Sequence, residues 1–214
     1  MNRRALLGIA ATLPFTAPLF SRAWAAAPPL GAQDRADIAR VERYLDTLKT
    51  LKSRFLQIAP DGTTSEGNAW LARPGRLRFE YDPPTPFLLV AGHGVVMFHD
   101  RKLQQTSSFP ISQTPLGILL SEQTKLSGDV TVSAVAREPG LLQLSLFRTA
   151  SPGDGSLTLG FADNPLALRQ WSVIDAQRME TRVTLFNIQL GERFDEKLFD
   201  VTDPRTNPNG GPGR

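Results

Sequence analysis

The two histidines of the chain could bind a metal ion or act as a general base near neutral pH. His93 and His99 flank an expected strand, so their side chains could share one face. A third ligand on that face is missing, because Asp100 points the other way. We therefore expect no metal site and interpret both histidines as ordinary turn and strand residues.

Other reactive groups also lack the motifs that catalysis needs. The serines cluster in loops and none lies in a G-x-S-x-G motif, which a nucleophile elbow requires. Gly92-x-Gly94 is not followed by the helix of a dinucleotide site. The absence of cysteine excludes disulfides, thiol nucleophiles, cysteine-based zinc sites and iron–sulfur clusters. We expect no catalytic residue, no cofactor and no enzymatic activity.

The first 25 residues have the layout of a secretory signal peptide. Arg3 and Arg4 lie in a basic head, residues 5–20 are mostly apolar, and Ala23 and Ala25 form a small-x-small cleavage motif. The apolar run is too short for a membrane span, which needs about 20 residues. We expect cleavage after Ala25 and Sec export to the periplasm, with twin-arginine export as an open alternative.

Removing this segment changes the charge of the protein. The full chain has 24 basic and 21 acidic residues, and the signal peptide contains three arginines and no acid. The mature protein is therefore neutral, without the basic patch expected of a nucleic-acid-binding protein. We expect no nucleic-acid partner.

The mature chain begins with one amphipathic helix and continues as strands. From Asp34 to about Arg54, apolar residues recur every three or four positions, which predicts a helix with one buried face. The spacing then changes to two. Short segments separated by Gly and Pro turns predict an antiparallel sheet or barrel. The expected strands are residues 55–58, 69–73, 77–81, 87–90, 95–98, 130–136, 141–147, 156–161, 168–175 and 180–189.

Two segments depart from this pattern. Thr114 and Pro115 are typical of a helix start, and the apolar residues Leu116, Ile118, Leu119 and Leu120 follow, so we expect a short helix that covers an apolar surface. Residues 207–214 contain Pro, Gly and Asn without an apolar anchor, and we expect them to be disordered.

The apolar strand residues allow two interpretations. Leu77, Phe79 and Tyr81 alternate with Arg78 and Glu80, and so face one side of the sheet. Together with residues of the next strand they could line a lipid-binding concavity that the short helix closes. They could equally form a filled sandwich core, and periodicity alone favours the filled core.

The segment from Gly67 to Pro84, which contains Arg73-Pro74-Gly75, resembles the signature of the outer-membrane lipoprotein carrier family, LolA. Phe55-x-Gln57, residues 95–105, residues 114–120 and residues 175–199 are similar to further family segments in the same order. The resemblance covers about residues 30–204. Departures include His93 in place of part of an Asp-Gly turn and Phe79 where tryptophan is frequent.

The resemblance implies a mainly β fold with helices (α+β). It would be an unclosed antiparallel β-barrel, or half-barrel, covered by the N-terminal amphipathic helix and a short helical lid, in one domain over residues 26–206. The implied function is that of a monomeric periplasmic chaperone. It would take acylated lipoproteins from an inner-membrane ABC transporter and pass them to an outer-membrane receptor.

The resemblance also implies roles for residues. Arg73 would hold the lid closed, and the acyl-chain cavity would be lined by Leu71, Leu77, Phe79, Tyr81, Phe87 and Leu89. Two other functions remain open: a related periplasmic module that senses or carries lipids or lipoproteins, and a hydrolase of envelope lipids.

Overall fold

The structure, a computed structural model, describes residues 30–201. The expected signal peptide (residues 1–25), its cleavage residues Ala23 and Ala25, and the expected tail (residues 207–214) lie outside the described residues. The proposed domain ends at 26 and 206 lie outside them as well.

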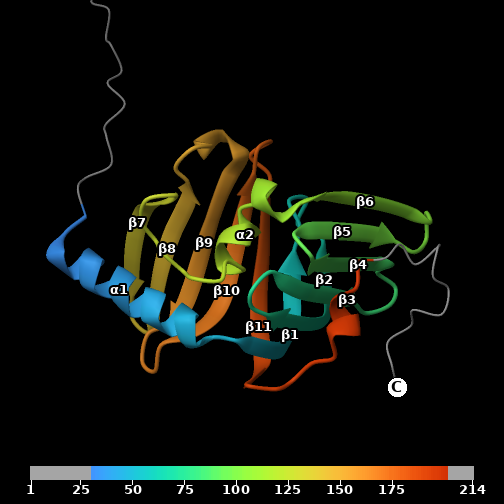
Figure 1. The fold of residues 1–214 in the computed structure, drawn as a ribbon, viewed down its shortest axis with the longest axis horizontal. Coiled ribbons are helices and arrows are strands. Elements are labelled where there is room, and N and C mark those ends of the chain that lie inside the picture. Colours follow the sequence, from blue (N-terminus) through green and yellow to red (C-terminus); the bar gives the residue numbers. More distant parts are fainter. Residues whose placement is uncertain (1–29, 202–214) are drawn as a thin grey trace, which may run out of the picture.

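Eleven strands form one antiparallel sheet in the order β6-β5-β4-β3-β2-β1-β11-β10-β9-β8-β7 (Figure 1). Within the described chain, β6 and β7 each pair on one side only, so the barrel is unclosed and the expected half-barrel is confirmed. The strands are β1 (Thr50–Ile58), β2 (Thr64–Ala72), β3 (Arg76–Tyr81), β4 (Phe87–Gly92), β5 (Val95–Asp100), β6 (Gln105–Pro110), β7 (Val130–Glu138), β8 (Leu141–Arg148), β9 (Gly155–Ala162), β10 (Ala167–Asp175) and β11 (Glu180–Leu190).

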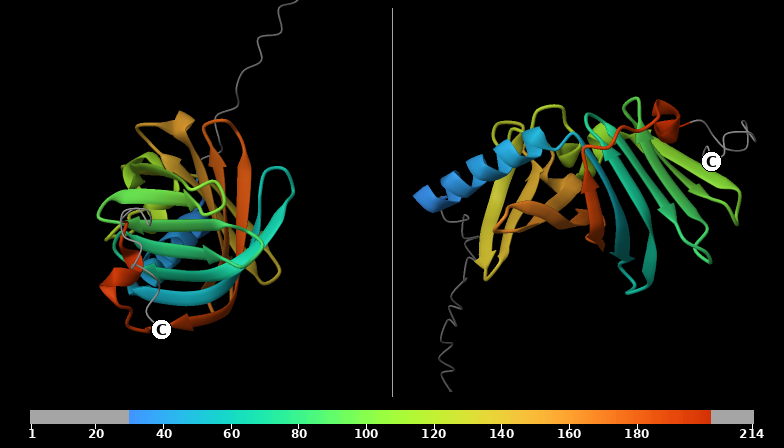
Figure 2. Two further views of the ribbon diagram at one scale, coloured as in Figure 1. Left: turned by 90° about the vertical axis from the view of Figure 1, so that its right-hand side faces the viewer. Right: turned by 90° about the horizontal axis from the view of Figure 1, so that it is seen from below.

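Helix α1 (Ala32–Thr47) lies across one end of the sheet, beside the half that contains β7 to β10 (Figure 2). It buries Val41 and Leu45. The expectation that the helix continues to about Arg54 is wrong, because the backbone becomes extended at Leu48 and enters β1. Leu51 and Phe55 fit the helical spacing, but they also alternate in a strand, and pairing with β2 and β11 decides between the two.

A long connection joins the two margins of the sheet on its concave side. It leaves β6 through the short helix η1 (Ile111–Gln113), forms the single-turn helix α2 (Leu116–Leu119), and reaches β7 (Figure 1). The hydroxyl of Thr114 accepts a hydrogen bond from the Gly117 amide at 3.3 Å, as expected of a residue that begins a helix. We call residues 111–126 the lid segment.

The C-terminal segment packs on the outer face of the same sheet. It follows β11 and contains the short helix η3 (Glu196–Phe199); a further short helix, η2 (Pro152–Asp154), precedes β9. The buried Phe199 lies directly against Gly92, where a Cβ atom would come within 2.4 Å of the Phe199 carbonyl oxygen. Arg78 donates to the carbonyl of Leu198 at 3.3 Å. Val201 covers a small outer cluster made of Leu88, Val90 and Met97.

Candidate acyl-chain site

The concave face of the sheet is a continuous apolar wall. Cross-strand pairs connect β1 to β5 in two neighbouring rows, so that apolar side chains from five strands lie side by side. The first row is Leu51, Leu71, Leu77, Ala91 and Val96. The second row begins at the one polar residue of the two, Ser53, and continues with Ala69, Phe79, Leu89 and Phe98.

Aromatic rings add to this wall beside the two rows. The ring centroids of Phe55 and Phe79 lie 4.6 Å apart, and those of Phe55 and Tyr81 lie 5.1 Å apart. The Phe87 ring extends the series from Tyr81, at 5.9 Å. The Tyr81 hydroxyl donates to Gln57 Oε1 at 2.7 Å, and burial raises the pKa of Tyr81 to about 12. The phenol therefore stays neutral at physiological pH, as an apolar wall requires.

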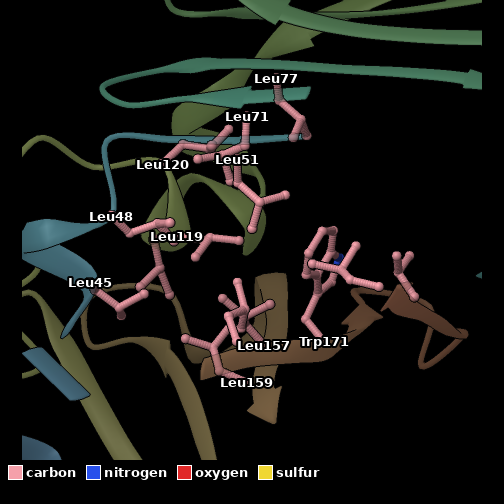
Figure 3. Close-up of a cluster of buried hydrophobic side chains, with 14 of the residues drawn as sticks. Leu45, Leu48, Leu51, Leu71, Leu77, Leu119, Leu120, Leu157, Leu159 and Trp171 are labelled. Carbon is pink, nitrogen blue, oxygen red and sulfur yellow. The ribbon is translucent and has the colours of Figure 1, made fainter. Parts of the chain in front are cut away.

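The lid segment covers this wall. Ile118, Leu119 and Leu120 are fully buried and belong to the same apolar cluster as the sheet residues. Leu119 and Leu120 lie next to Leu51, and the leucines of β2 and β3 lie beyond (Figure 3). Leu116 is half-buried, and Leu120 lies just after the last residue of α2. Burying each such side chain contributes about 1.5–3 kcal/mol.

Arg73 connects the sheet to the lid. It follows β2 directly and is buried, with 6% of its surface exposed. Its guanidinium donates from Nε and Nη2 to the carbonyl of Ser121, at 3.1 and 2.6 Å, and from Nη2 to the Thr124 hydroxyl. Nη1 donates to the Leu45 carbonyl in the last turn of α1. One planar group with five donors thus joins the turn after β2, the lid segment and α1.

Two features of the surroundings shift the pKa of Arg73 in opposite directions. Burial lowers the pKa of the guanidinium, because desolvation penalises the charged form. The carboxylate of Asp46 opposes this effect. Asp46 therefore serves as the counter-charge of the buried arginine.

Two carboxylates of α1 bind the lid segment at its backbone. Asp46 Oδ1 accepts from the Thr124 amide at 3.1 Å, and Glu42 Oε1 accepts from the Leu126 amide at 2.7 Å. The Gly75 amide donates to the Leu120 carbonyl at 2.8 Å. These contacts could not be predicted from the sequence, because Glu42 and Asp46 look like ordinary residues of the charged face of the helix.

Helix α1 is itself fixed to the other half of the sheet. Arg137 of β7 forms ion pairs with Asp34 and Asp37, each at 2.7 Å. The Leu168 amide of β10 donates to the Tyr44 hydroxyl at 3.0 Å. The lid is therefore held between a fixed helix and the turn that carries Arg73.

The structure brings together the residues expected to line the cavity. Leu71, Leu77, Phe79 and Tyr81 are buried on the concave wall, and Phe87 and Leu89 are half-buried beside them. With the lid in place they form one packed cluster. Two pockets, of about 370 and 390 Å³, lie elsewhere. The first lies beside Phe199 and the second is lined mainly by polar residues of β8 to β11.

The two histidines occupy separate environments. His93 lies at the tip of the β4–β5 turn with φ 50°, whereas His99 is buried in β5, where Nδ1 lies 2.9 Å from the Thr106 hydroxyl. Among residues 30–201, no group of three or more His, Asp or Glu side chains could hold a metal ion. No helix in the same range is long and apolar enough to cross a membrane.

The sequence matches the family described as outer membrane lipoprotein carrier protein LolA over residues 46–202. The chain belongs to the LolA family. The match begins in the last turn of α1 and includes Arg73, the concave wall and the lid segment, so these features lie within the LolA region.

Two sequence relatives are named as outer-membrane lipoprotein carrier proteins. An outer-membrane lipoprotein carrier protein of Methylococcus capsulatus is 29% identical over 176 residues, which cover 78% of this chain and 83% of the relative. The protein of the same name from Azotobacter vinelandii is 26% identical, covering 89% and 95% of the two chains. The crystal structure of a LolA superfamily protein from Nitrosomonas europaea aligns with a TM-score of 0.41 at 10% identity, covering 76% of this chain and 97% of the other.

Proposed function

We propose that this protein is a periplasmic carrier that shields the acyl chains of lipoproteins on its concave wall. It takes them from an inner-membrane ABC transporter and delivers them to an outer-membrane receptor. The observation that carries the proposal is the apolar wall under a lid that polar contacts hold in place. Membership of the LolA family and relatives named as lipoprotein carriers support it.

The wall has the chemistry that acyl chains need. Each CH₂ group buried away from water contributes about 0.8 kcal/mol, so a lipoprotein with long chains cannot cross an aqueous compartment unshielded. The side chains of Ile118, Leu119 and Leu120 fill the concave side in the closed form. In the open form, acyl chains would replace them against Leu71, Leu77 and Phe79.

The lid must also let the cargo leave. The contacts of Arg73, Asp46 and Glu42 with the lid are hydrogen bonds, each worth about 0.5–3 kcal/mol net. Such contacts can be exchanged one at a time, and a receptor that binds the chains more tightly would determine the direction of transfer. The proposed role of Arg73 is to hold the closed state after the cargo has gone.

Depletion of the protein in its source cell tests the function. We expect outer-membrane lipoproteins to accumulate at the inner membrane, as measured by membrane fractionation. Normal sorting after depletion would contradict the carrier role and favour a module that senses lipids or lipoproteins. In the purified system, Arg73→Leu should slow transfer to the receptor. Transfer by Arg73→Leu at the wild-type rate would contradict the role proposed for Arg73.

A further inference from the structure

Ser53 carries a polar atom on the apolar wall that has no partner. The residue is 3% exposed, and its Oγ makes no hydrogen bond within the described structure. The other two buried side-chain polar atoms of this kind among residues 30–201 are the Nε atoms of Arg40 and Arg148. Ser53 differs from them because it is neutral and lies in the central strand of the sheet.

The neighbours of Ser53 explain why its hydroxyl is unpaired. Leu51 and Phe55 flank it on the same face of β1, and Ala69 lies opposite on β2. None of these side chains has a hydrogen-bond acceptor. On the other side, the register between β1 and β11 shifts next to Ser53, where Asn187 has φ 54°. The hydroxyl therefore faces the concave side among apolar groups.

An unpaired buried hydroxyl destabilises a protein, and an alanine of nearly the same size would avoid that cost. A ligand with a hydrogen-bond acceptor would supply the missing partner. An acyl chain is apolar along its length. It is attached to the lipoprotein through an ester or amide, whose carbonyl oxygen accepts hydrogen bonds. Ser53 pairs with the small residue Ala69, so once the lid has opened, a carbonyl group could reach its hydroxyl past that side chain.

We propose that Ser53 Oγ donates a hydrogen bond to the ester or amide carbonyl of an acyl chain bound on the concave wall. The inference rests on the proposed function and adds a linkage preference to it. Ser53 then selects carbonyl-linked chains over plain alkyl chains. The row from Ser53 through Ala69, Phe79 and Leu89 to Phe98 provides the apolar surface for the attached chain.

Two matched ligands test the proposal: a synthetic lipopeptide with two palmitoyl ester chains, and its counterpart with two hexadecyl ether chains. Displacement of a fluorescent fatty-acid probe from the full mature protein gives both affinities. We expect the preference for the ester ligand to fall about fivefold in Ser53→Ala, the effect of losing one neutral hydrogen bond. Ser53→Thr keeps the hydroxyl and should retain the preference.

Ser145→Ala is the matched control, because Ser145 lies in β8 on the polar outer face and contacts the Thr158 hydroxyl at 3.0 Å. Its ester-to-ether ratio should equal that of the wild type. An equal ratio in wild type and Ser53→Ala, with both ligands bound, would overturn the role of Ser53. Failure of the wild type to bind either ligand would instead contradict the carrier function. Thermal unfolding of each variant confirms that it is folded.

Discussion

Arg73, at the end of β2, donates a hydrogen bond to the backbone carbonyl of Leu45, in the last turn of α1. The same guanidinium binds the lid segment at Ser121. One buried side chain thus joins three segments that are far apart in the sequence. Removing it leaves two backbone carbonyls without this donor.

Arg73→Leu should destabilise the closed lid. Leucine keeps the bulk of the side chain but donates no hydrogen bond, so the free energy of unfolding should fall by about 2 kcal/mol or more. Hydrogen exchange should show faster exchange of the Gly75 amide, which donates to Leu120. Arg73→Lys keeps the charge and part of the bonding, and should have a smaller effect. Unchanged exchange in Arg73→Leu would contradict the role of Arg73 and show that the other lid contacts are sufficient.

Asp46→Asn and Glu42→Gln should loosen the lid segment without affecting the rest of α1. An amide oxygen is a weaker acceptor than a carboxylate, so the exchange of the Thr124 and Leu126 amides should speed up about fivefold each. Asp37→Asn removes a contact to Arg137 at the other end of the helix and is the control. If all three variants raised the exchange rates of both amides equally, the effect would come from destabilisation of the whole helix and not from the two lid contacts.

Gly92→Ala should displace the C-terminal segment from the outer face. The new Cβ atom would lie 2.4 Å from the carbonyl oxygen of Phe199, a contact that forces backbone atoms apart. We expect a loss of about 1–3 kcal/mol of stability and faster proteolysis near η3. Gly153→Ala, where nothing lies within 4 Å of the added atom, should leave both unchanged. Equal proteolysis of the two variants would contradict the contact.

Tyr81 should make stability depend on alkaline pH. Its pKa is about 12 in the folded protein against an ordinary value of 10.0, so the unfolded chain loses the phenol proton first. The stabilisation is complete below pH 10 and is lost between about pH 10 and 12, by about 2–3 kcal/mol. Urea unfolding across this range should show the decrease. Tyr81→Phe should reduce it, leaving the contribution of Tyr44, whose pKa burial also raises.

The sequence predicted the sheet well where local alternation agrees with burial. Leu77, Phe79 and Tyr81 alternate along β3, and their neighbours on the outer face are charged. The end of α1 could not be predicted, because Leu51 and Phe55 satisfy both helical and strand spacing. Strand β6 was missed because its polar residues lie at the margin of the sheet and are mostly exposed.

The polar contacts of the site could not be predicted from local sequence patterns. The match to the family motif predicted that Arg73 contacts the lid. Its partners Leu45, Ser121 and Thr124 could not be predicted, because they come from distant segments. Ser53 gave no signal, since a serine in a strand is ordinary. Only the structure shows that its Oγ is buried without a hydrogen-bond partner.

The connection between β6 and β7 also limits how far the half-barrel can open. Because it joins the two margins of the sheet, releasing Arg73 frees its contacts but leaves both ends attached to the strands. The margins can separate only as far as the contour length of this connection permits, about 3.3–3.6 Å per residue when fully extended. Opening of the lid would therefore be a rearrangement of residues 111–126 between two fixed points of attachment, and not the swing of a segment that is free at one end.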